Sequence, residues 1–245
     1  MDEKSEVRRR MQTYATMCDE LHIVVLADRV HADHREGNLF LYPVPGNILM
    51  RRFVAFGTAR RIASQRKMDV ITAHSPDELG LIAYLVARSF GARLQLQVHT
   101  DILSPWYRRA GMIPRMKYML ARYLLPRANC LRVVSMRISR SLVRELQIKP
   151  EVISVVPIVV DVGKFAHAHS ASKNREDETV CRIISFGRFV EKEKNFSMLI
   201  RSMALVIKKY PAAKLVIAGD GPDREYYQSL ISALRLEHTI FLESW

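Results

Sequence analysis

The chain has 245 residues, of which 49% are hydrophobic, so it can bury the core of one large or two modest globular domains. No apolar run approaches the roughly 20 residues that cross a bilayer, and the start "MDEKSEVRRR" lacks the apolar core of a secretory signal. The cytoplasm is therefore the expected compartment. The three cysteines form no C-x-x-C pair, which argues against a disulfide framework and against a cysteine zinc site.

The net charge of +13 is concentrated in the first two thirds of the chain. Residues 1–165 carry 26 basic and 15 acidic side chains, whereas residues 166–245 carry 12 and 10. Residues 102–144 contain ten Arg or Lys and no Asp or Glu. This excess favours a polyanion or an anionic surface as a partner.

Short aliphatic runs alternate with helical periodicity along the first part of the chain. Strands are expected at 21–27, 69–74, 93–99, 130–135 and 153–161, and helices at about 5–18, 48–66, 77–90, 112–126 and 137–146. Apolar strands that are each followed by a helix predict a parallel sheet with helices packed on it. The expected fold class is therefore α/β.

The alternation stops over residues 167–179, a polar segment without periodicity that we expect to be a linker. It then restarts, with strands expected at 181–187, 214–219 and 239–244 and helices at about 195–209 and 222–234. The sequence thus predicts two Rossmann-like parallel-sheet domains in series, residues 1–166 and 180–245. The second would have only three strands and a bare apolar edge, so we expect it to be incomplete.

The first candidate site follows the strand that opens the second domain. Ligands of open parallel sheets bind beyond the carboxyl ends of strands, where Gly187 and Arg188 stand here. Lys194 is expected to open the next helix, so a guanidinium, an ammonium and a helix N-terminus would together suit a diphosphate. The alternative, judged from spacing alone, is that these are surface cations beside Glu191 and Glu193.

A second glycine turn, "AGDGPDREYY" at 218–227, follows the next strand. It matches neither the P-loop nor the G-x-G-x-x-G pattern. Turn chemistry alone explains Gly219, Gly221 and Pro222. Because the turn ends a neighbouring strand, it is a candidate lining of the same pocket as Gly187.

Polar side chains also follow two strands of the first domain. His74 and Ser75 end one strand, and His99 and Asp101 come at the end of the next. An imidazole there can donate a hydrogen bond to a substrate hydroxyl or oxyanion, and the two histidines would face one cleft. The alternative is that each histidine is structural.

The acid-free stretch includes "SPWYRRAGMIPRMKYMLARYLLPRA", in which apolar and aromatic residues recur at helical spacing among arginines. Such a helix suits the interface of an anionic membrane. A core helix with solvated arginines is an equally good interpretation. Nucleic acid is not an expected partner, because no recognition motif accompanies the charge.

Six segments, in their order along the chain, resemble retaining glycosyltransferases of the family-4 type. They are "DVITAHSPDELGLIAYLVAR", "LQLQVHTDILSP", "LRVVSMRISRSLV", "VVPIVVDVGKF", "IISFGRFVEKEKNFSMLIRSM" and "KLVIAGDGPDREYYQSL". The resemblance implies the GT-B architecture and transfer of a sugar, with retention, from a nucleotide-sugar donor to a lipid-linked or polysaccharide acceptor. It also implies a role in cell-envelope polysaccharide biosynthesis, peripheral on the inner face of the plasma membrane.

The same resemblance implies roles for residues of the second domain. Arg188 and Lys194 would stabilise the leaving nucleoside diphosphate as catalytic cations. Gly187, Gly219 and Gly221 would line the donor site with them. No cofactor or metal is expected, because in such enzymes the two cations take the place of a metal.

On the acceptor side, the resemblance implies that His99 is a catalytic residue that reaches toward the transferred sugar. His74, Ser75 and Asp101 would lie near the acceptor.

This sequence also departs from the family pattern. The Asn and Gly of the family's Asn-Gly-Val-Asp turn are replaced by Ile158 and Val159, so that only Val160 and Asp161 match. The opening strand and its glycine-rich loop are missing, and the paired glutamates would lie beyond Trp245. We therefore expect a fragment with impaired activity. The alternative is an inactive remnant that still binds a nucleotide or an anionic surface.

Overall fold

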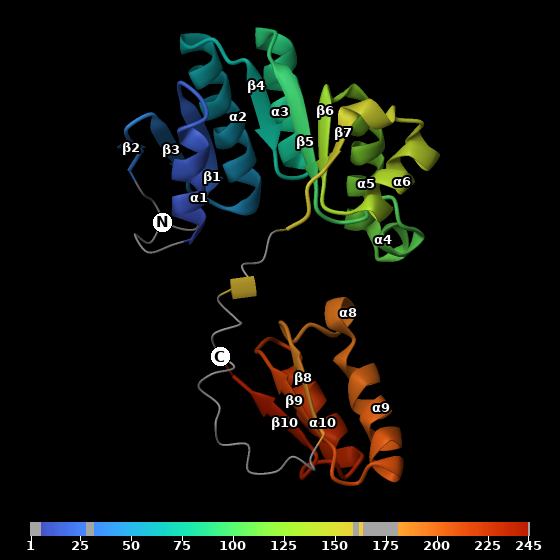
Figure 1. The fold of residues 1–245 in the computed structure, drawn as a ribbon. Coiled ribbons are helices and arrows are strands. Elements are labelled where there is room, and N and C mark those ends of the chain that lie inside the picture. Colours follow the sequence, from blue (N-terminus) through green and yellow to red (C-terminus); the bar gives the residue numbers. More distant parts are fainter. Residues whose placement is uncertain (1–5, 28–31, 159–161, 164–180, 245) are drawn as a thin grey trace. The chain divides into compact units, whose positions relative to one another are not determined.

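The computed structural model describes residues 6–27, 32–158, 162–163 and 181–244 (Figure 1). The chain divides into two compact units, which we call unit 1 (residues 1–160) and unit 2 (residues 161–245). The predicted linker and Asp161 lie outside the described residues.

Unit 1 contains two sheets, and most of its elements were expected from the sequence. In chain order they are α1 (Glu6–Ala15), β1 (Leu21–Leu26), β2 (His34–Glu36), β3 (Leu39–Val44), α2 (Ile48–Gln65), β4 (Val70–Ala73), α3 (Glu78–Phe90), β5 (Arg93–Val98), α4 (Pro105–Arg109), α5 (Met112–Leu124), η1 (Leu125–Arg127), β6 (Cys130–Val133), α6 (Met136–Leu146), η2 (Pro150–Val152) and β7 (Ile153–Val155). The larger sheet is parallel, in the order β4-β5-β6-β7.

The smaller sheet corrects the prediction that β1 belongs to the same sheet as β4. β1 pairs in parallel with β3, and β2 pairs antiparallel on the other side of β3. The sequence did not predict β3, because Pro43 within a short apolar run argues against a strand.

The loop that follows β4 is fixed by the start of α3. The Asp77 carboxylate accepts the N–H of Leu79 at 3.2 Å and so caps the helix. The helix ends at Gly91, which adopts the left-handed conformation (φ 70°) that L-residues with a side chain disfavour. A cap at each end thus sets the length of α3 and anchors the segment that carries His74.

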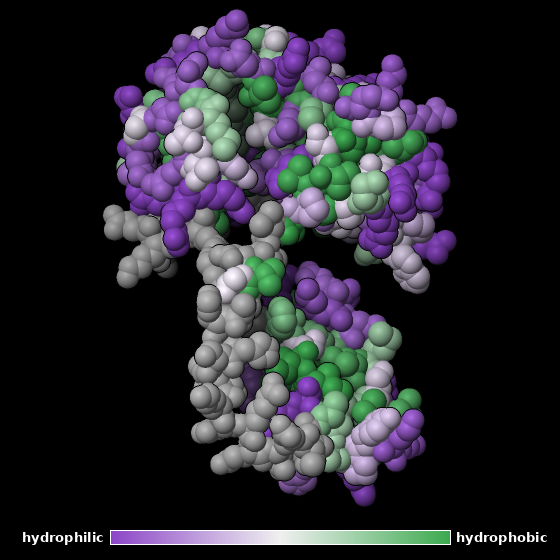
Figure 2. All heavy atoms as spheres, viewed as in Figure 1, coloured by the Kyte–Doolittle hydropathy of each residue, from purple (hydrophilic) through white to green (hydrophobic). Residues whose placement is uncertain are grey.

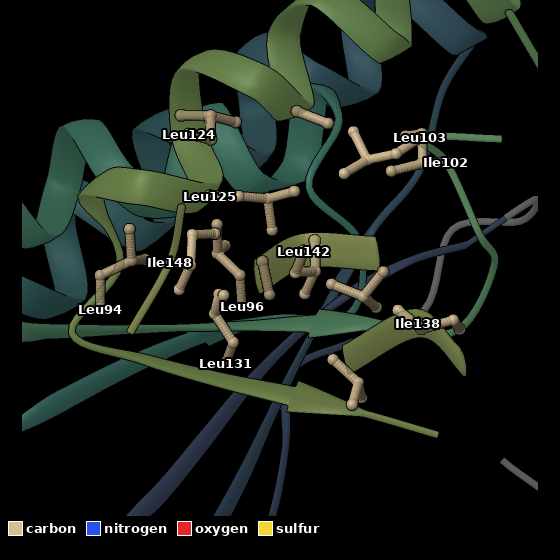
Figure 3. Packing of buried hydrophobic residues seen from close by; sticks show 14 of the residues in the cluster. Leu94, Leu96, Ile102, Leu103, Leu124, Leu125, Leu131, Ile138, Leu142 and Ile148 are labelled. Atoms are coloured by element: carbon tan, nitrogen blue, oxygen red, sulfur yellow. The ribbon is translucent and has the colours of Figure 1, made fainter. Parts of the chain in front are cut away.

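The core of unit 1 lies between the larger sheet and the helices on one of its faces. Leu94, Leu96 and Leu131 from the strands meet Leu124 of α5 and Leu142 of α6 (Figure 3), and all five are at most 3% exposed. Burying each such side chain contributes about 1.5–3 kcal/mol to stability. This face holds the sheet rigid, and the polar residues of the strands point to the other face.

Helix α5 has features of both alternatives left by the sequence. Leu124 is buried, but Met112, Met116 and Met119 are 80%, 65% and 64% exposed, and Trp106 of α4 is 83% exposed. Helix α5 therefore packs on the core through Ala121 and Leu124, as a core helix does, while these methionines and Trp106 are exposed. None of the described helices is long and apolar enough to span a membrane.

Unit 2 is a three-stranded parallel sheet with its helices. Its elements are β8 (Arg182–Phe186), α8 (Glu191–Lys194), α9 (Phe196–Lys209), β9 (Lys214–Ala218), α10 (Arg224–Ala233) and β10 (Ile240–Glu243), and the strand order is β10-β9-β8. Phe189, Ile200 and Tyr227 form a core with the strands. Apolar side chains gather over the strands (Figure 2), where Ile184 and Phe186 are 70% and 77% exposed.

Candidate functional site

Two turns leave the same edge of the unit 2 sheet and are bonded to each other. We call them the paired turns, residues 187–190 after β8 and 219–223 after β9. The Gly187 N–H donates to the carbonyl of Ala218 (3.0 Å), and the Phe189 N–H donates to that of Asp220 (2.8 Å). A third bond runs from the Asp223 N–H to the Phe189 carbonyl (3.1 Å). The backbone of this edge is therefore held in one arrangement.

Glycine is required for the paired turns to pack. A Cβ on Gly219 would lie 2.0 Å from the carbonyl oxygen of Gly187, and one on Gly221 would lie 2.5 Å from that of Phe189. Both distances are far below van der Waals contact, so any other residue would push the turns apart. The observed role of these two glycines is to bring the turns together.

Lys194 lies near Gly187, although the predicted helix start is wrong. Lys194 ends the single-turn helix α8, and α9 begins at Phe196, because Asn195 between them is left-handed (φ 52°). A Cβ built on Gly187 would be 3.3 Å from Cε of Lys194. The glycine thus leaves room for the lysine side chain to lie across the strand exit.

A carboxylate already caps the start of α9, which corrects the idea that this helix end is open to an anion. Glu191 accepts the N–H of Ser197 (3.2 Å) and its hydroxyl (2.6 Å). Although burial opposes the change, these hydrogen bonds lower the pKa of Glu191. This cap could not be predicted from residue spacing, because the two residues are six positions apart rather than the usual three.

The Arg188 guanidinium is paired with a neighbour of Lys194. Its Nη2 lies 3.1 and 3.2 Å from the two carboxylate oxygens of Glu193, and the side chains are 65% and 54% exposed. Exposed pairs of this kind contribute about 0–1 kcal/mol and exchange readily. Among the described residues no carboxylate pairs with Lys194. Both cations therefore belong to one short segment at the edge where the paired turns meet.

In unit 1 the two predicted histidines do come together. The rings of His74, after β4, and His99, after β5, are stacked with centroids 6.1 Å apart and planes 14° apart. Each ring keeps an exposed side. Partial burial lowers the pKa of both. The positive charge of Arg132 lowers the pKa of His74 further, and His74 and then Arg132 lower that of His99. Both shifts favour the neutral imidazole.

A row of polar side chains below His99 was missed by sequence reasoning. Gln97 Oε1 lies 3.2 Å from Nε2 of His99 and accepts a hydrogen bond from Nη1 of Arg132 at 3.0 Å. Gln97 is only 7% exposed, so these contacts are sheltered from water. The signal was present in "RLQLQVH", where polar residues alternate with apolar ones and must share a face.

Ser75, predicted on the acceptor side, is engaged within unit 1. Its hydroxyl donates to the Asp77 carboxylate (2.5 Å), which also accepts from Lys117 (3.0 Å). Although burial opposes it, the hydrogen bonds from Ser75 and Lys117 lower the pKa of Asp77. Ser75 therefore supports the cap of α3.

Asp101 lines a hollow of about 380 Å³ between the start of α4 and one face of α6. Its carboxylate lies 3.7 Å from Nε of Arg137. Arg140 and Arg144, one and two turns further along α6, line the same hollow. Among the residues the structure describes, no three His, Cys, Asp or Glu are grouped to hold a metal ion.

Two family profiles match the chain in sequence order. Residues 10–164 match the profile described as Glycosyltransferase Family 4, and residues 168–244 match that described as Glycosyl transferases group 1. The first match alone covers more than half of the chain.

Similar proteins include two bacterial relatives. An uncharacterized glycosyltransferase, YqgM of Bacillus subtilis, is 29% identical over 187 residues, which are 76% of this chain and 49% of that protein. The alpha-monoglucosyldiacylglycerol synthase of Streptococcus pneumoniae is 28% identical over 70% of this chain and 41% of its own length. The chain thus spans about half the length of the relatives it matches.

Among solved structures, that of Alr3699/HepE from Anabaena in complex with UDP and glucose is similar to this chain. The TM-score is 0.60 at 15% identity, and the match covers 84% of this chain and 55% of that one. At this identity the likeness bears on the fold, and it confirms the predicted α/β architecture of Rossmann-like domains in series.

Proposed function

The chain belongs to glycosyltransferase family 4, and from that premise we propose that it transfers a sugar from a nucleotide-sugar donor to a lipid-linked or polysaccharide acceptor. The C1–O bond to the diphosphate breaks and its electron pair leaves with the diphosphate. The acceptor oxygen bonds to C1 on the same face, with retention, as its O–H bond breaks and the proton passes to the departing diphosphate oxygen. The observation that carries the proposal is the gathering of Arg188 and Lys194 at the interlocked edge of unit 2.

Two cations suit the electrostatics of this reaction. Negative charge grows on the diphosphate as the sugar leaves, and cations already in position stabilise that charge without reorganisation. Gly187, Gly219 and Gly221 form the backbone against which the diphosphate would lie. The proposal needs no metal, because Arg188 and Lys194 supply the positive charge.

A binding titration tests this site directly. UDP is titrated into the 245-residue chain, and then into its Arg188→Ala and Lys194→Ala variants. Losing one charged hydrogen bond costs about 1.5–3 kcal/mol, so each variant should bind about 10-fold or more weakly. Lys208→Ala, in the last turn of α9, removes a cation from the other end of that helix and should bind as the original chain does.

Equal affinity in the original chain and both variants would refute the diphosphate site. The titration needs no turnover, so a turnover assay with a nucleotide sugar is what separates the enzyme from the alternative of a nucleotide-binding remnant. That alternative predicts UDP binding, but no sugar transferred or hydrolysed from the donor over long incubation.

On the acceptor side, the proposal assigns His99 to the transferred sugar, and His74 and Asp101 to the acceptor. Asp101 shares its hollow with Arg137, Arg140 and Arg144, which favours an acceptor that carries an anionic group. In turnover assays, Arg140→Gln should therefore raise KM for an acceptor with a phosphate and leave KM for the donor unchanged. An unchanged acceptor KM would argue against this assignment.

We place the acceptor at the cytoplasmic face of a membrane. Support comes from the exposed apolar side chains of α4 and α5, among them Trp106 and Met116, within residues 102–144, which hold ten basic and no acidic residues. Basic residues near anionic lipid contribute about 1 kcal/mol each to binding.

Vesicle sedimentation tests the membrane contact. The chain should bind vesicles with phosphatidylglycerol in a salt-sensitive manner and should not bind pure phosphatidylcholine. Trp106→Ser with Met116→Ser should weaken binding several-fold by removing buried apolar area, whereas Met198→Ser, an equally exposed methionine of unit 2, should not. Salt-insensitive sedimentation, or none, would contradict this part.

A further inference from the structure

A series of hydrogen bonds crosses the polar face of the larger sheet of unit 1, and the donor and acceptor of each bond can be assigned in only one way. The Arg132 guanidinium can only donate, so the Gln97 atom 3.0 Å from it must be the carbonyl oxygen. The Gln97 amide nitrogen then faces the Thr72 hydroxyl at 3.5 Å, and that hydroxyl donates to Gln95 Oε1 at 3.1 Å. Each contact agrees with a single orientation of the Gln97 amide.

This orientation fixes the proton of His99. Nε2 of His99 lies 3.2 Å from the Gln97 oxygen, and an amide oxygen can only accept, so Nε2 carries the hydrogen. A neutral imidazole has a single N–H, and burial together with Arg132 favours the neutral form. Nδ1 is then left with a lone pair and no hydrogen.

We propose that Arg132 and Gln97 position His99 so that its Nδ1 accepts a hydrogen bond from a hydroxyl of the transferred sugar. Arg132 and Gln97 are positioning residues, because they act through His99. The stacked ring of His74 adds a second restraint, since it limits rotation of the His99 ring. This replaces the expectation from the sequence that His99 donates.

The proposal selects a class of ligand. A lone pair at Nδ1 attracts the O–H group of a sugar and repels a carboxylate or phosphate oxygen, which has no hydrogen to give. His99 therefore recognises the uncharged part of a nucleotide sugar, and its identification with the transferred sugar rests on the proposed function.

Nitrogen NMR of the 15N-labelled chain tests the proton position without any ligand. The His99 signals are assigned by comparison with His99→Asn, and the coupling pattern of the ring nitrogens shows which one carries hydrogen. We expect Nε2–H in the original chain. In Arg132→Met the Gln97 amide can turn its N–H₂ toward His99, so the Nδ1–H form should become populated and the pKa of His99 should rise.

The matched control is Arg93→Met, which removes an exposed arginine from the start of β5. It should leave both the proton position and the pKa of His99 unchanged. Hydrogen on Nδ1 in the original chain, or an unchanged tautomer and pKa in Arg132→Met, would overturn the proposal. A change of the same size in Arg93→Met would also overturn it, because the effect would then be a general loss of charge.

The ligand part is tested by comparing a nucleotide sugar with the matching nucleoside diphosphate. The ratio of the two affinities isolates the sugar, because both ligands share the diphosphate. His99→Leu should lower the ratio about 2- to 10-fold, as expected for the loss of one hydrogen bond, and His99→Asn, which keeps an acceptor oxygen near the position of Nδ1, should restore part of it. An unchanged ratio in His99→Leu would refute sugar recognition.

The two failures are distinguishable. If neither nucleotide ligand binds, the proposed function is wrong, while the NMR result still decides the roles of Arg132 and Gln97. If both ligands bind but hydrogen resides on Nδ1, the proposed function stands and this inference falls.

Discussion

Glu193 competes with the proposed diphosphate for Arg188, so removing its charge should increase the affinity for UDP. The two carboxylate oxygens of Glu193 accept from the guanidinium at 3.1 and 3.2 Å, so this anion already pairs with the cation that the proposal gives to the diphosphate. A ligand that binds Nη2 must displace this pair, and a ligand that binds another N–H group of Arg188 is still repelled by the charge of Glu193. Glu193→Gln should therefore tighten the binding of UDP, although the substitution removes a hydrogen-bonded ion pair.

The size of the effect follows from exposure. Two unit charges about 4 Å apart attract by about 1 kcal/mol in water. The side chains of Arg188 and Glu193 are 65% and 54% exposed, and exposed pairs measure about 0.2–1 kcal/mol. UDP should bind about 1.4- to 5-fold more tightly to Glu193→Gln. The gain should be larger at 10 mM salt than at 150 mM, because the screening length falls from about 30 to about 8 Å.

Calorimetric titration of UDP at the two salt concentrations measures this difference. The control is Glu237→Gln. Glu237 is an exposed glutamate between α10 and β10, and the substitution removes the same charge at the amino end of β10. Tighter binding in Glu193→Gln alone is the expected result. Weaker binding would mean that Glu193 holds Arg188 in place for the ligand, and equal tightening in both variants would mean that only net charge matters.

Further predictions concern stability, pH and the paired turns. Gly219→Ala should destabilise unit 2 by more than 3 kcal/mol in urea denaturation, because its Cβ would lie 2.0 Å from the Gly187 oxygen. The control is Gly91→Ala, whose Cβ would have no atom within 4 Å and which should destabilise unit 1 by only about 1 kcal/mol. Equal losses of stability in the two variants would contradict the packing argument. Asp77→Asn should destabilise unit 1 by about 1 kcal/mol at pH 7. Because folding lowers the pKa of Asp77, its carboxylate contributes fully to stability above the unfolded pKa. The difference in unfolding free energy between the variant and the original chain should vanish as the pH falls through the folded pKa. The pKa values of His74 and His99 are also lowered, so unit 1 should lose stability as the pH falls below the unfolded value near 6.5. The measurement is the unfolding free energy as a function of pH, for the original chain and for a His74→Gln, His99→Asn double variant. Parallel curves for the two would show that these histidines do not contribute to the pH dependence.

Much of this fold was predictable because parallel α/β units repeat a local signal. β4, β5 and β6 are each a short apolar run followed by a helix with a cap, as at Asp77 and Ser135, and the predicted bounds of these strands differ from the observed ones by at most two residues. The strand expected at 153–161 ends at Val155. Strand ends could be placed from these runs, so His74 and His99 were expected at one edge and lie there. β3 was missed because Pro43 contradicts its local pattern while tertiary pairing with β1 overrides it.

The remaining parts of the site depend on contacts between residues far apart in the chain. The chain does not reveal that Gln97 meets Arg132, because the two residues are 35 positions apart and are brought together only by the register of β5 and β6. The cap of Glu191 on α9 depends on a left-handed Asn195, which lets the chain double back. The alternation of Gln95 and Gln97 with leucines did signal a polar face, but only the fold decides what that face contacts.

The two candidate sites, at the paired turns and around His99, both lie on a rigid backbone, but their side chains are adaptable in the first and held in place in the second. In the paired turns the backbone is locked by glycine packing and three cross-turn hydrogen bonds, but Arg188 and Lys194 extend from it as exposed, adaptable cations. Such an arrangement suits a diphosphate, whose charge is large and whose oxygens are many. Around His99, by contrast, the side chains themselves are locked by directed hydrogen bonds to a buried glutamine. That degree of order is needed where one lone pair must meet one hydroxyl, because a neutral hydrogen bond weakens steeply with misalignment. Substitutions that loosen the Gln97 network should therefore reduce discrimination between sugars, and those in the paired turns should reduce affinity for every diphosphate alike.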